Sequence, residues 1–284
     1  MNIKKLTNVS FIILLGWLLS GSGCDTLSND DPDDAGSGTF SVLLTDAPFP
    51  SNLLKNAFIY VDSLDVRQKG SETDTGAYIT LSSTPATFDL MDLRNGVTAT
   101  LAELDIPEGT YSQVRLFVDS AKVVLIDSSE FPLKVPSGAS TGLKVFIRPD
   151  IIVEEGITSE LLLDFDISKS FVARGSLNGP KGITGFNLKP VIRAVNLATA
   201  GRLRGTVTDT SDTGIADVQV AISSQDSVLT STFTDTTGAY ALLGIPVGTY
   251  TVEAEAAGYL TETVTDVAVD EQGTTVQNFT LLPE

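Results

Sequence analysis

Short runs of β-type residues, separated by turn residues, extend over most of this sequence and restrict it to an all-β fold. From Thr39 onward, no long stretch repeats its apolar residues with the period of an amphipathic helix. Many short strands separated by Gly, Pro, Asp and Ser favour a β-sandwich or a β-barrel. One short helix is expected, around 98–104. The runs that suit strands lie at 40–46, 57–66, 77–81, 87–93, 111–119, 122–127, 143–147 and 159–167.

Alternation of apolar and polar residues indicates which side of a strand faces a core. In the run at 111–119, the apolar side is Val114, Leu116 and Val118, and the polar side is Gln113, Arg115 and Asp119. A second unit begins near Gly201 and alternates more regularly. Its apolar positions are Val218, Val220 and Ile222 in one run, and Tyr250, Val252 and Ala254 in another. We therefore expect about seven strands in a second sandwich.

Turn residues punctuate the second unit at SDTG (211–214), TDTTG (234–238) and IPVGTY (245–250). An Asp side chain can accept hydrogen bonds from its own turn, and Gly adopts the left-handed conformation. A near copy of the third stretch, IPEGTY, occupies 106–111. Because Pro restricts φ and Gly turns the chain, both copies predict a tight entry into the next strand rather than an internal duplication.

Composition excludes several classes of function. The chain has 18 Lys and Arg against 36 Asp and Glu, for a net charge of −18, so nucleic acid is not an expected partner. It contains no His, which excludes Ser-His-Asp catalysis and His-based zinc sites within this chain. Its single Cys cannot form an internal disulfide. No cofactor is expected, and an enzyme is not predicted.

The first 23 residues have the pattern of a secretory signal peptide. Lys4 and Lys5 precede the apolar run FIILLGWLL (11–19), which is too short to cross a bilayer. Small residues then lead into Cys24, and this stretch resembles the lipobox of bacterial lipoproteins, although Gly21 stands where the family usually has Leu. The resemblance implies diacylation of the Cys24 thiol with palmitate-type chains and an outer-membrane location in a Gram-negative cell. Ordinary secretion with an incidental Cys is the alternative.

The segment 24–38 carries a run of acids and almost no apolar residues, so it predicts a flexible tether. Its acids resemble the export signal that follows the lipidated Cys in some surface-exposed lipoproteins. The alternative is an acidic linker without an addressing role. The protein would then be either periplasmic or exposed on the cell surface.

Two resemblances cover the remaining sequence. Residues 39–198 resemble a family of bacterial lipoprotein domains of uncharacterised function, through VLLTDAP (42–48), FDLMDLRNG (88–96), IPEGTYSQVRLFVD (106–119), VPSGASTGLKV (135–145), LLLDFDISKSFV (161–172) and FNLKPVIRAV (186–195). Residues 201–284 resemble the carboxypeptidase regulatory-like family, through GTVTD (205–209), TGIADVQVAI (213–222), TDTTGAY (234–240), LLGIPVGTYTVEAEAAGY (242–259) and FTLL (279–282). The second resemblance implies a transthyretin-like sandwich, grouped with starch-binding-like folds, that is non-catalytic and lacks zinc ligands.

Few residues are candidates for chemistry. GASTG (138–142) matches the nucleophile elbow of hydrolases, but it lies between strands in a chain without His, so Ser140 is read as part of a hairpin loop. Asp46, Asp164 and Asp166 are weak candidates for Ca²⁺, which takes about six to eight oxygen ligands. A solvated acidic face is the other interpretation of these residues.

Glycan binding would use exposed aromatic rings. The only Trp, Trp17, belongs to the signal peptide, so Tyr78 and Tyr259 are the weak candidates.

Together these patterns predict two β-sandwich domains in tandem after a signal peptide (1–23) and an acidic tether (24–38). The expected role is a membrane-anchored, non-catalytic module that binds or displays a glycan or another envelope protein. One alternative is a structural spacer or adhesion scaffold. A second alternative is an enzyme with paired carboxylates, which requires two acids about 5 to 10 Å apart in a cleft.

Overall fold

The computed structural model describes residues 36–47, 53–70, 78–135, 138, 140–177, 179–225 and 227–284. The predictions for the signal peptide, for Cys24 and for nearly all of the tether lie outside these residues. The segment Ala35–Glu284 forms one compact unit. Within the described ranges, no helix is long and apolar enough to span a membrane.

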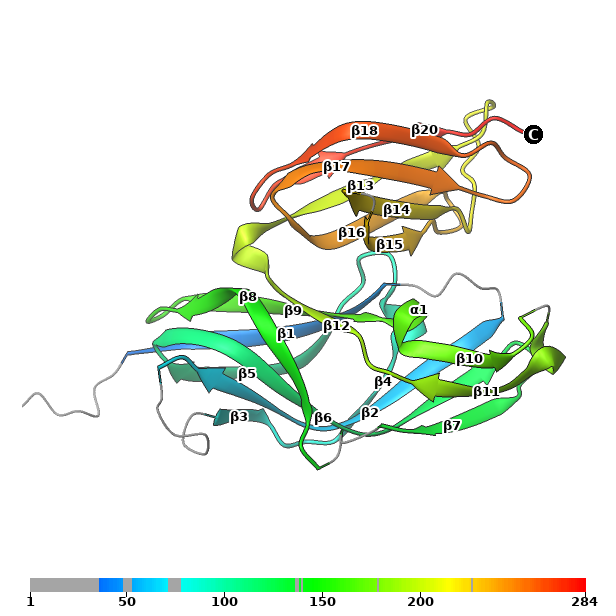
Figure 1. The fold of residues 1–284 in the computed structure, drawn as a ribbon. Helices are drawn as coiled ribbons and strands as arrows, with labels where there is room; N and C mark the ends of the chain where they lie inside the picture. The colour runs from blue at the N-terminus through cyan, green and yellow to red at the C-terminus, as the bar shows by residue number, and fades with distance from the viewer. Residues whose placement is uncertain are drawn as a thin grey trace, which may run out of the picture. The chain divides into compact units, whose positions relative to one another are not determined.

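Strands dominate both domains (Figure 1). Those of the first are β1 (Ser37–Ala47), β2 (Leu54–Gln68), β3 (Tyr78–Ser82), β4 (Ala86–Asp89), β5 (Ala99–Pro107), β6 (Gly109–Leu125), β7 (Glu130–Lys134), β8 (Leu143–Val153), β9 (Thr158–Asp166), β10 (Phe171–Gly175), β11 (Ile183–Leu188) and β12 (Ile192–Asn196). The helical segments are single turns: η1 (Leu90–Leu93), α1 (Ile167–Ser170), η2 (Pro180–Gly182) and η3 (Leu197–Thr199). The second domain has β13 (Ala200–Thr208), β14 (Gln219–Ser224), β15 (Ser227–Phe233), β16 (Ala239–Pro246), β17 (Gly248–Glu255), β18 (Glu262–Val269), β19 (Thr274–Val276) and β20 (Phe279–Thr280).

One ten-stranded sheet forms the body of the first domain. Its strands follow the order β3-β2-β6-β8-β12-β9-β1-β5, with β4 paired to β2 and β7 paired to β6. Strand β1 is parallel to β9 and antiparallel to β5. Strands β10 and β11 form a separate hairpin. The order therefore places β1 between two strands that follow it much later in the chain.

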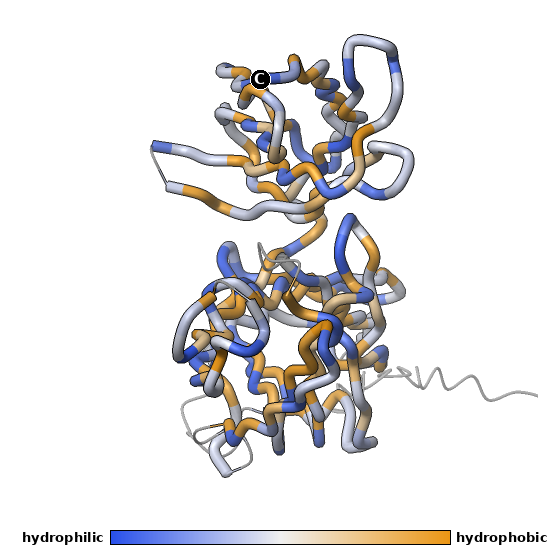
Figure 2. The backbone as a smooth tube through the Cα atoms, turned by 90° about the vertical axis from the view of Figure 1, so that its right-hand side faces the viewer, coloured by the Kyte–Doolittle hydropathy of each residue, from blue (hydrophilic) through white to orange (hydrophobic). Residues whose placement is uncertain are grey.

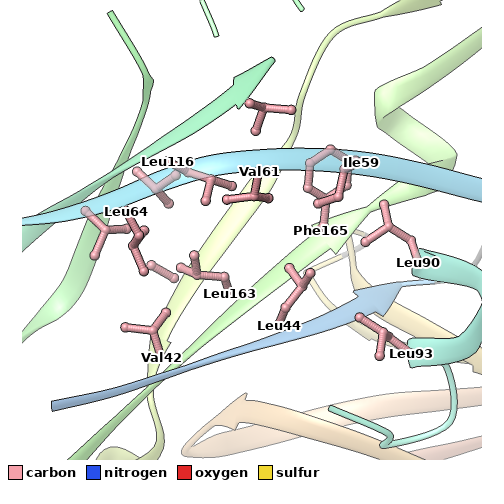
Figure 3. Close-up of a cluster of buried hydrophobic side chains, with 14 of the residues drawn as sticks. Val42, Leu44, Ile59, Val61, Leu64, Leu90, Leu93, Leu116, Leu163 and Phe165 are labelled. Carbon is pink, nitrogen blue, oxygen red and sulfur yellow. The ribbon is translucent and has the colours of Figure 1, made fainter. Parts of the chain in front are cut away.

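The core of this domain lies between two layers of the same sheet. Figure 3 shows side chains of β2 and β6 facing those of β1 and β9, with η1 at one end. All of the labelled side chains are buried: Val42, Leu44, Ile59, Val61, Leu64, Leu90, Leu93, Leu116, Leu163 and Phe165. The layers enclose one contiguous apolar cluster, as a sandwich requires.

The second domain is a sandwich of two sheets. One has the order β16-β13-β19, with β20 also paired to β13, and the other has the order β15-β14-β17-β18. The six apolar positions predicted from alternation are all buried, namely Val218, Val220, Ile222, Tyr250, Val252 and Ala254. Figure 2 shows hydrophilic and hydrophobic residues interleaved along the strands of both domains. The predicted all-β class, with domains in tandem, is confirmed.

Local predictions fail where tertiary pairing overrides a local pattern. The segment 98–104, expected to be helical, lies mostly in β5, because 99–107 pairs along β1. The expected strand at 87–93 ends at Asp89, whose carboxylate caps η1 by accepting from the Met91 amide at 3.1 Å. The runs at 111–119 and 122–127 belong to one long strand, β6. Strands β7, β10, β11 and β12 were not predicted.

Candidate functional site

The three acidic candidates lie at the end of two neighbouring strands. In the parallel ladder of β1 and β9, Thr45 pairs with Asp164 and Asp46 pairs with Phe165. Asp46, Asp164 and Asp166 are 6%, 5% and 9% exposed. The interpretation as a solvated acidic face is therefore wrong, because the ladder draws these carboxylates into the protein.

Asp164 is held by a cation from the next strand. Arg193 lies directly opposite it on β12, and the Arg193 Nη2 atom is 2.7 Å from Asp164 Oδ2. Two contacts reach the second domain: Arg193 Nη1 donates to the Gly244 carbonyl at 2.7 Å, and Thr230 Oγ1 donates to Asp164 Oδ2 at 3.4 Å. The ion pair thus belongs to the junction between the domains.

Asp46 lies beside this ion pair without a cation of its own. Its Oδ1 atom accepts from the Ile167 amide at 3.3 Å, while its Oδ2 atom, Asp164 Oδ1 and Thr232 Oγ1 have no hydrogen-bond partner among the described residues. All three side chains line a cavity of about 10 Å³, which is room for one water molecule. Burial, and next the charge of Asp164, raise the pKa of Asp46 well above its ordinary value.

Asp166 has a local structural role. Its carboxylate caps α1, accepting from Ser168 Oγ at 2.6 Å and from the Lys169 amide at 3.0 Å, and it pairs with Lys169 Nζ at 2.8 Å. In the described part of the chain, no group of three or more Cys, Asp and Glu side chains is arranged to hold a metal ion. The Asp46–Asp164 pair lines a cavity far too small for a sugar, so this pair does not form a glycosidase site.

Sequence reasoning missed a polar contact that joins the domains. Asn95 Nδ2 donates to the Ala239 carbonyl at 3.2 Å, and Asn95 Oδ1 accepts from the Ala241 amide at 2.6 Å. Asn95 has a φ of 58°, in the left-handed region. The Asn-Gly dipeptide at 95–96 was the available signal for a turn, but nothing in it indicated a partner 146 residues away.

A larger cavity of about 490 Å³ opens near the start of the second domain. Its polar lining comes from Thr98, Thr158, Glu160, Arg202 and Gln272, and its apolar lining includes Leu43, Leu197 and Leu243. None of the described residues that line it is aromatic. The cavity therefore lacks the flat apolar surface on which a sugar ring stacks.

Tyr78, the first candidate for ligand binding, lies on the outer face of the large sheet. Its hydroxyl donates to Gln113 Oε1 at 2.5 Å, across strand β2. The guanidinium carbon of Arg115 lies 3.8 Å from the centre of the Tyr78 ring, and that of Arg67 lies 5.9 Å from it. These distances are those of cation–π contacts.

The same outer face continues onto β8. Phe146 is directly opposite Gln113, and Lys144 is directly opposite Arg115. Phe146 is 59% exposed, and the Arg148 guanidinium carbon lies 5.8 Å from the centre of its ring. We call Arg67, Tyr78, Arg115, Lys144, Phe146 and Arg148 the arginine–aromatic face. Of this set, only Tyr78 was a binding candidate from the sequence, because alternation identifies one face of a strand but not its neighbours.

Tyr259 is not part of such a cluster. It forms an isolated bridge with Pro283, and its half-buried ring packs against the core of the second domain. Ser140 is exposed in a turn that precedes β8, in a chain without His. Of the predicted ligand-binding residues, only Tyr78 is accompanied by exposed aromatic and cationic side chains.

These features define a two-domain, all-β protein in which a large curled sheet precedes a smaller β-sandwich. The chain belongs to the family described as a domain of unknown function (DUF4382), whose sequence model matches residues 37–190. The carboxypeptidase regulatory-like domain matches residues 202–282. The two resemblances predicted from sequence motifs are confirmed. Neither family description names a catalytic activity.

Solved structures with some likeness come from several bacteria. A chain of a cohesin–X-dockerin complex from Acetivibrio cellulolyticus is 21% identical over 29% of this chain and 58% of its own length, with a TM-score of 0.25. A protein of Bacteroides uniformis, described as a candidate carbohydrate-binding protein, is 18% identical over 29% of this chain and 41% of its own, with a TM-score of 0.26. A mutant shaft pilin of Lactobacillus rhamnosus GG is 12% identical over 87% of this chain and 98% of its own length, with a TM-score of 0.26. The first two structures are thus each matched over less than two thirds of their own length. No curated protein matches the sequence.

Proposed function

We propose that this protein is a non-catalytic lipoprotein of the cell envelope that binds glycans. Cys24 carries the lipid anchor, and the arginine–aromatic face carries the ligand site. The observation that supports binding at this place is the exposed Phe146 ring, which lies on a sheet face with cationic side chains beside it. Sugars bind proteins through such combinations of a flat apolar surface and nearby hydrogen-bond donors.

The face is well suited to preorganised recognition. Its side chains project from adjacent strands of one sheet, so their backbone positions are held by ladder hydrogen bonds. The Tyr78 ring is further oriented by its hydrogen bond to Gln113, which is itself 3% exposed. The entropy cost of ordering these side chains is therefore largely met on folding, before a ligand binds.

A glycan array probed with the full chain tests the binding proposal. We expect binding by the wild type and loss of that binding in Phe146→Ala. The matched control is Val276→Ala, which truncates a comparably exposed residue of the second domain. Arrays that stay blank for the wild type would contradict glycan binding.

Lipid anchoring needs a separate experiment. The wild type should incorporate a radioactive fatty acid and fractionate with outer membranes, whereas Cys24→Ala should remain unlabelled and soluble. If the wild type takes up no label, the proposed anchor is wrong, and ordinary secretion becomes the better reading of residues 1–24.

A structural spacer or adhesion scaffold is the second candidate. The contacts of Asn95 and Arg193 across the domain junction favour it, because they join the two domains into a continuous body. Blank glycan arrays, combined with unchanged anchoring and stable folding, are the result expected for this role.

A further inference from the structure

We propose that the arginine–aromatic face recognises an acidic polysaccharide whose sugars carry carboxylate groups. This inference rests on the proposed glycan-binding function and names the class of ligand for that site.

The distribution of charge is the first argument. The chain has only 18 Lys and Arg among its 284 residues, yet four of them, Arg67, Arg115, Lys144 and Arg148, lie on the outer face of three neighbouring strands. Among the described residues of this face, the acid is Asp65, which lies opposite Arg115. Arg115, Lys144 and Arg148 outnumber it, which makes this part of the face locally positive on a protein whose net charge is −18. A positive patch on an acidic protein attracts an anionic partner locally.

Two exposed cations of the face have donors to spare. Neither Lys144 nor Arg148 forms an ion pair with any residue that the structure describes. Elsewhere on the same sheet, cations are paired: Lys69 contacts Asp150 at 2.5 Å, and Lys122 contacts Glu130 at 3.3 Å. The donors of Lys144 and Arg148 therefore remain available to the carboxylates of a ligand.

The local backbone accommodates the Arg115 position. Gly142, just before β8, has a φ of 69°, and a Cβ atom at that position would collide with the Cγ atom of Arg115. Glycine thus allows the stem of Arg115 to lie against the chain while its guanidinium stacks on Tyr78. The stack is part of the fold and is present before any ligand arrives.

The shape of the face favours a polysaccharide over other polyanions. Between Tyr78 on β3 and Phe146 on β8 there are three interstrand steps, or about 14 Å. Along β8 itself, the exposed positions Lys144, Phe146 and Arg148 place a ring between two cations on one line. Carboxylated sugars present both an apolar ring face and an anionic group to such a line. A lipid surface or nucleic acid would instead bring a dense layer of phosphates against a chain of net charge −18.

Binding to defined polymers tests the inference. The full chain is titrated with polygalacturonate and with neutral dextran, each in about 50 mM and about 500 mM NaCl, since exposed charge contacts are screened at high salt. We expect binding to polygalacturonate that weakens with salt and falls at least about tenfold in the Lys144→Glu, Arg148→Glu double variant. The control is Lys134→Glu, Arg204→Glu, which makes the same charge change at two exposed positions outside the face. Thermal melting verifies that each variant is folded.

Each other outcome overturns the inference. Equal losses in both double variants would mean a nonspecific effect of net charge. Stronger binding to phosphatidylglycerol vesicles or to duplex DNA would identify a phosphate surface as the partner. Binding to dextran that depends on Phe146 but not on salt would leave glycan binding in place and remove only the acidic specificity. Failure to bind any polymer or arrayed glycan would remove both proposals.

Discussion

At the scale of single residues, Asp46 shows how burial changes the chemistry of a carboxyl group. It is 6% exposed, lies next to Asp164, and faces a cavity that holds at most one water. The nearby cation Arg193 pairs with Asp164 instead. The other charged groups that act on it are Asp166, which opposes ionisation, and Arg94, which favours it only weakly. Burial and these charges therefore raise the pKa of the Asp46 carboxyl in the folded protein.

The consequence is a pH dependence of stability with a defined sign. Because folding raises the pKa of Asp46, the folded state holds this proton more tightly than the unfolded state does. The stability that this proton contributes is complete below the ordinary pKa of 3.8. It is lost as pH rises toward the pKa of Asp46 in the folded protein. We expect the melting temperature of Asp46→Asn, relative to the wild type, to increase as pH rises from about 4 to about 8.

Thermal melts of both proteins across that range measure the difference. Glu160→Gln is the matched control, since Glu160 is exposed on the neighbouring strand β9. A difference between Asp46→Asn and the wild type that does not change with pH would show that the Asp46 carboxyl is ionised in the fold.

At the scale of elements, the two near-identical stretches IPEGTY and IPVGTY build the same corner. In each, a strand ends at the Pro and the next begins at the Gly, as β5 meets β6 and β16 meets β17. The Tyr111 hydroxyl donates to the Pro107 carbonyl at 2.8 Å, and the Tyr250 hydroxyl donates to the Pro246 carbonyl at 2.7 Å. Both rings are buried, at 0% and 8% exposure. The tight strand entry predicted from the sequence is thus locked by a side-chain hydrogen bond that the sequence pattern did not reveal.

Removing either hydroxyl should weaken its corner without changing the fold. Tyr111→Phe and Tyr250→Phe are each expected to lower the free energy of unfolding by about 1 kcal/mol, the usual contribution of one such hydrogen bond. Chemical denaturation followed by circular dichroism measures the loss. Tyr259→Phe should change nothing, because the Tyr259 hydroxyl has no hydrogen bond to the described residues. Equal effects in all three variants would argue against the corner.

At the scale of the whole described chain, the two domains are joined by both apolar and polar contacts. Leu162 and Val195 of the first domain form a small cluster with Ala200, and Leu243 of the second packs against it. Next to this cluster, Arg193 bridges Asp164 and the Gly244 carbonyl. Substituting Arg193 would leave the Asp164 carboxylate buried without its cation.

Arg193→Met is expected to cost about 3 kcal/mol of unfolding free energy, the low end for a buried pair, because its guanidinium side chain is 25% exposed. The double variant Asp164→Asn, Arg193→Met should recover part of that loss, since it removes the unpaired charge. Arg204→Met, an exposed change in β13, serves as the control. If the double variant is no more stable than Arg193→Met, the ion pair is not the source of the effect.

Some features of the fold follow directly from local patterns in the sequence. Alternation identified the buried side of β14 and β17, and turn residues marked the connections between strands. At TDTTG, Asp235 accepts from the Thr237 and Ala239 amides, as expected for an Asp in a turn. Short strands such as β10 and β11 escaped prediction, because five or six residues without a regular alternation of apolar and polar side chains carry little periodic signal.

The site residues escaped prediction for a different reason. Asp46, Asp164 and Tyr78 were candidate site residues from the sequence, but their partners Arg193, Thr230 and Arg115 were not recognised as such. Each partner lies on another strand, and many pairings of the same strands would satisfy the same backbone hydrogen bonds. The stable pairing is the one in which both layers bury their apolar side chains together.

The sequence by itself determined that this protein is all-β, how its domains are ordered, and which side of several strands is apolar, since a two-residue period and turn chemistry act over a few residues. Only the tertiary structure decided that β1 lies beside β9, which buries two aspartates at the domain junction, and that β3, β2, β6 and β8 lie side by side, which assembles the arginine–aromatic face. The physical reason is that strand pairing is nonlocal: the order of strands is selected by packing of the whole core.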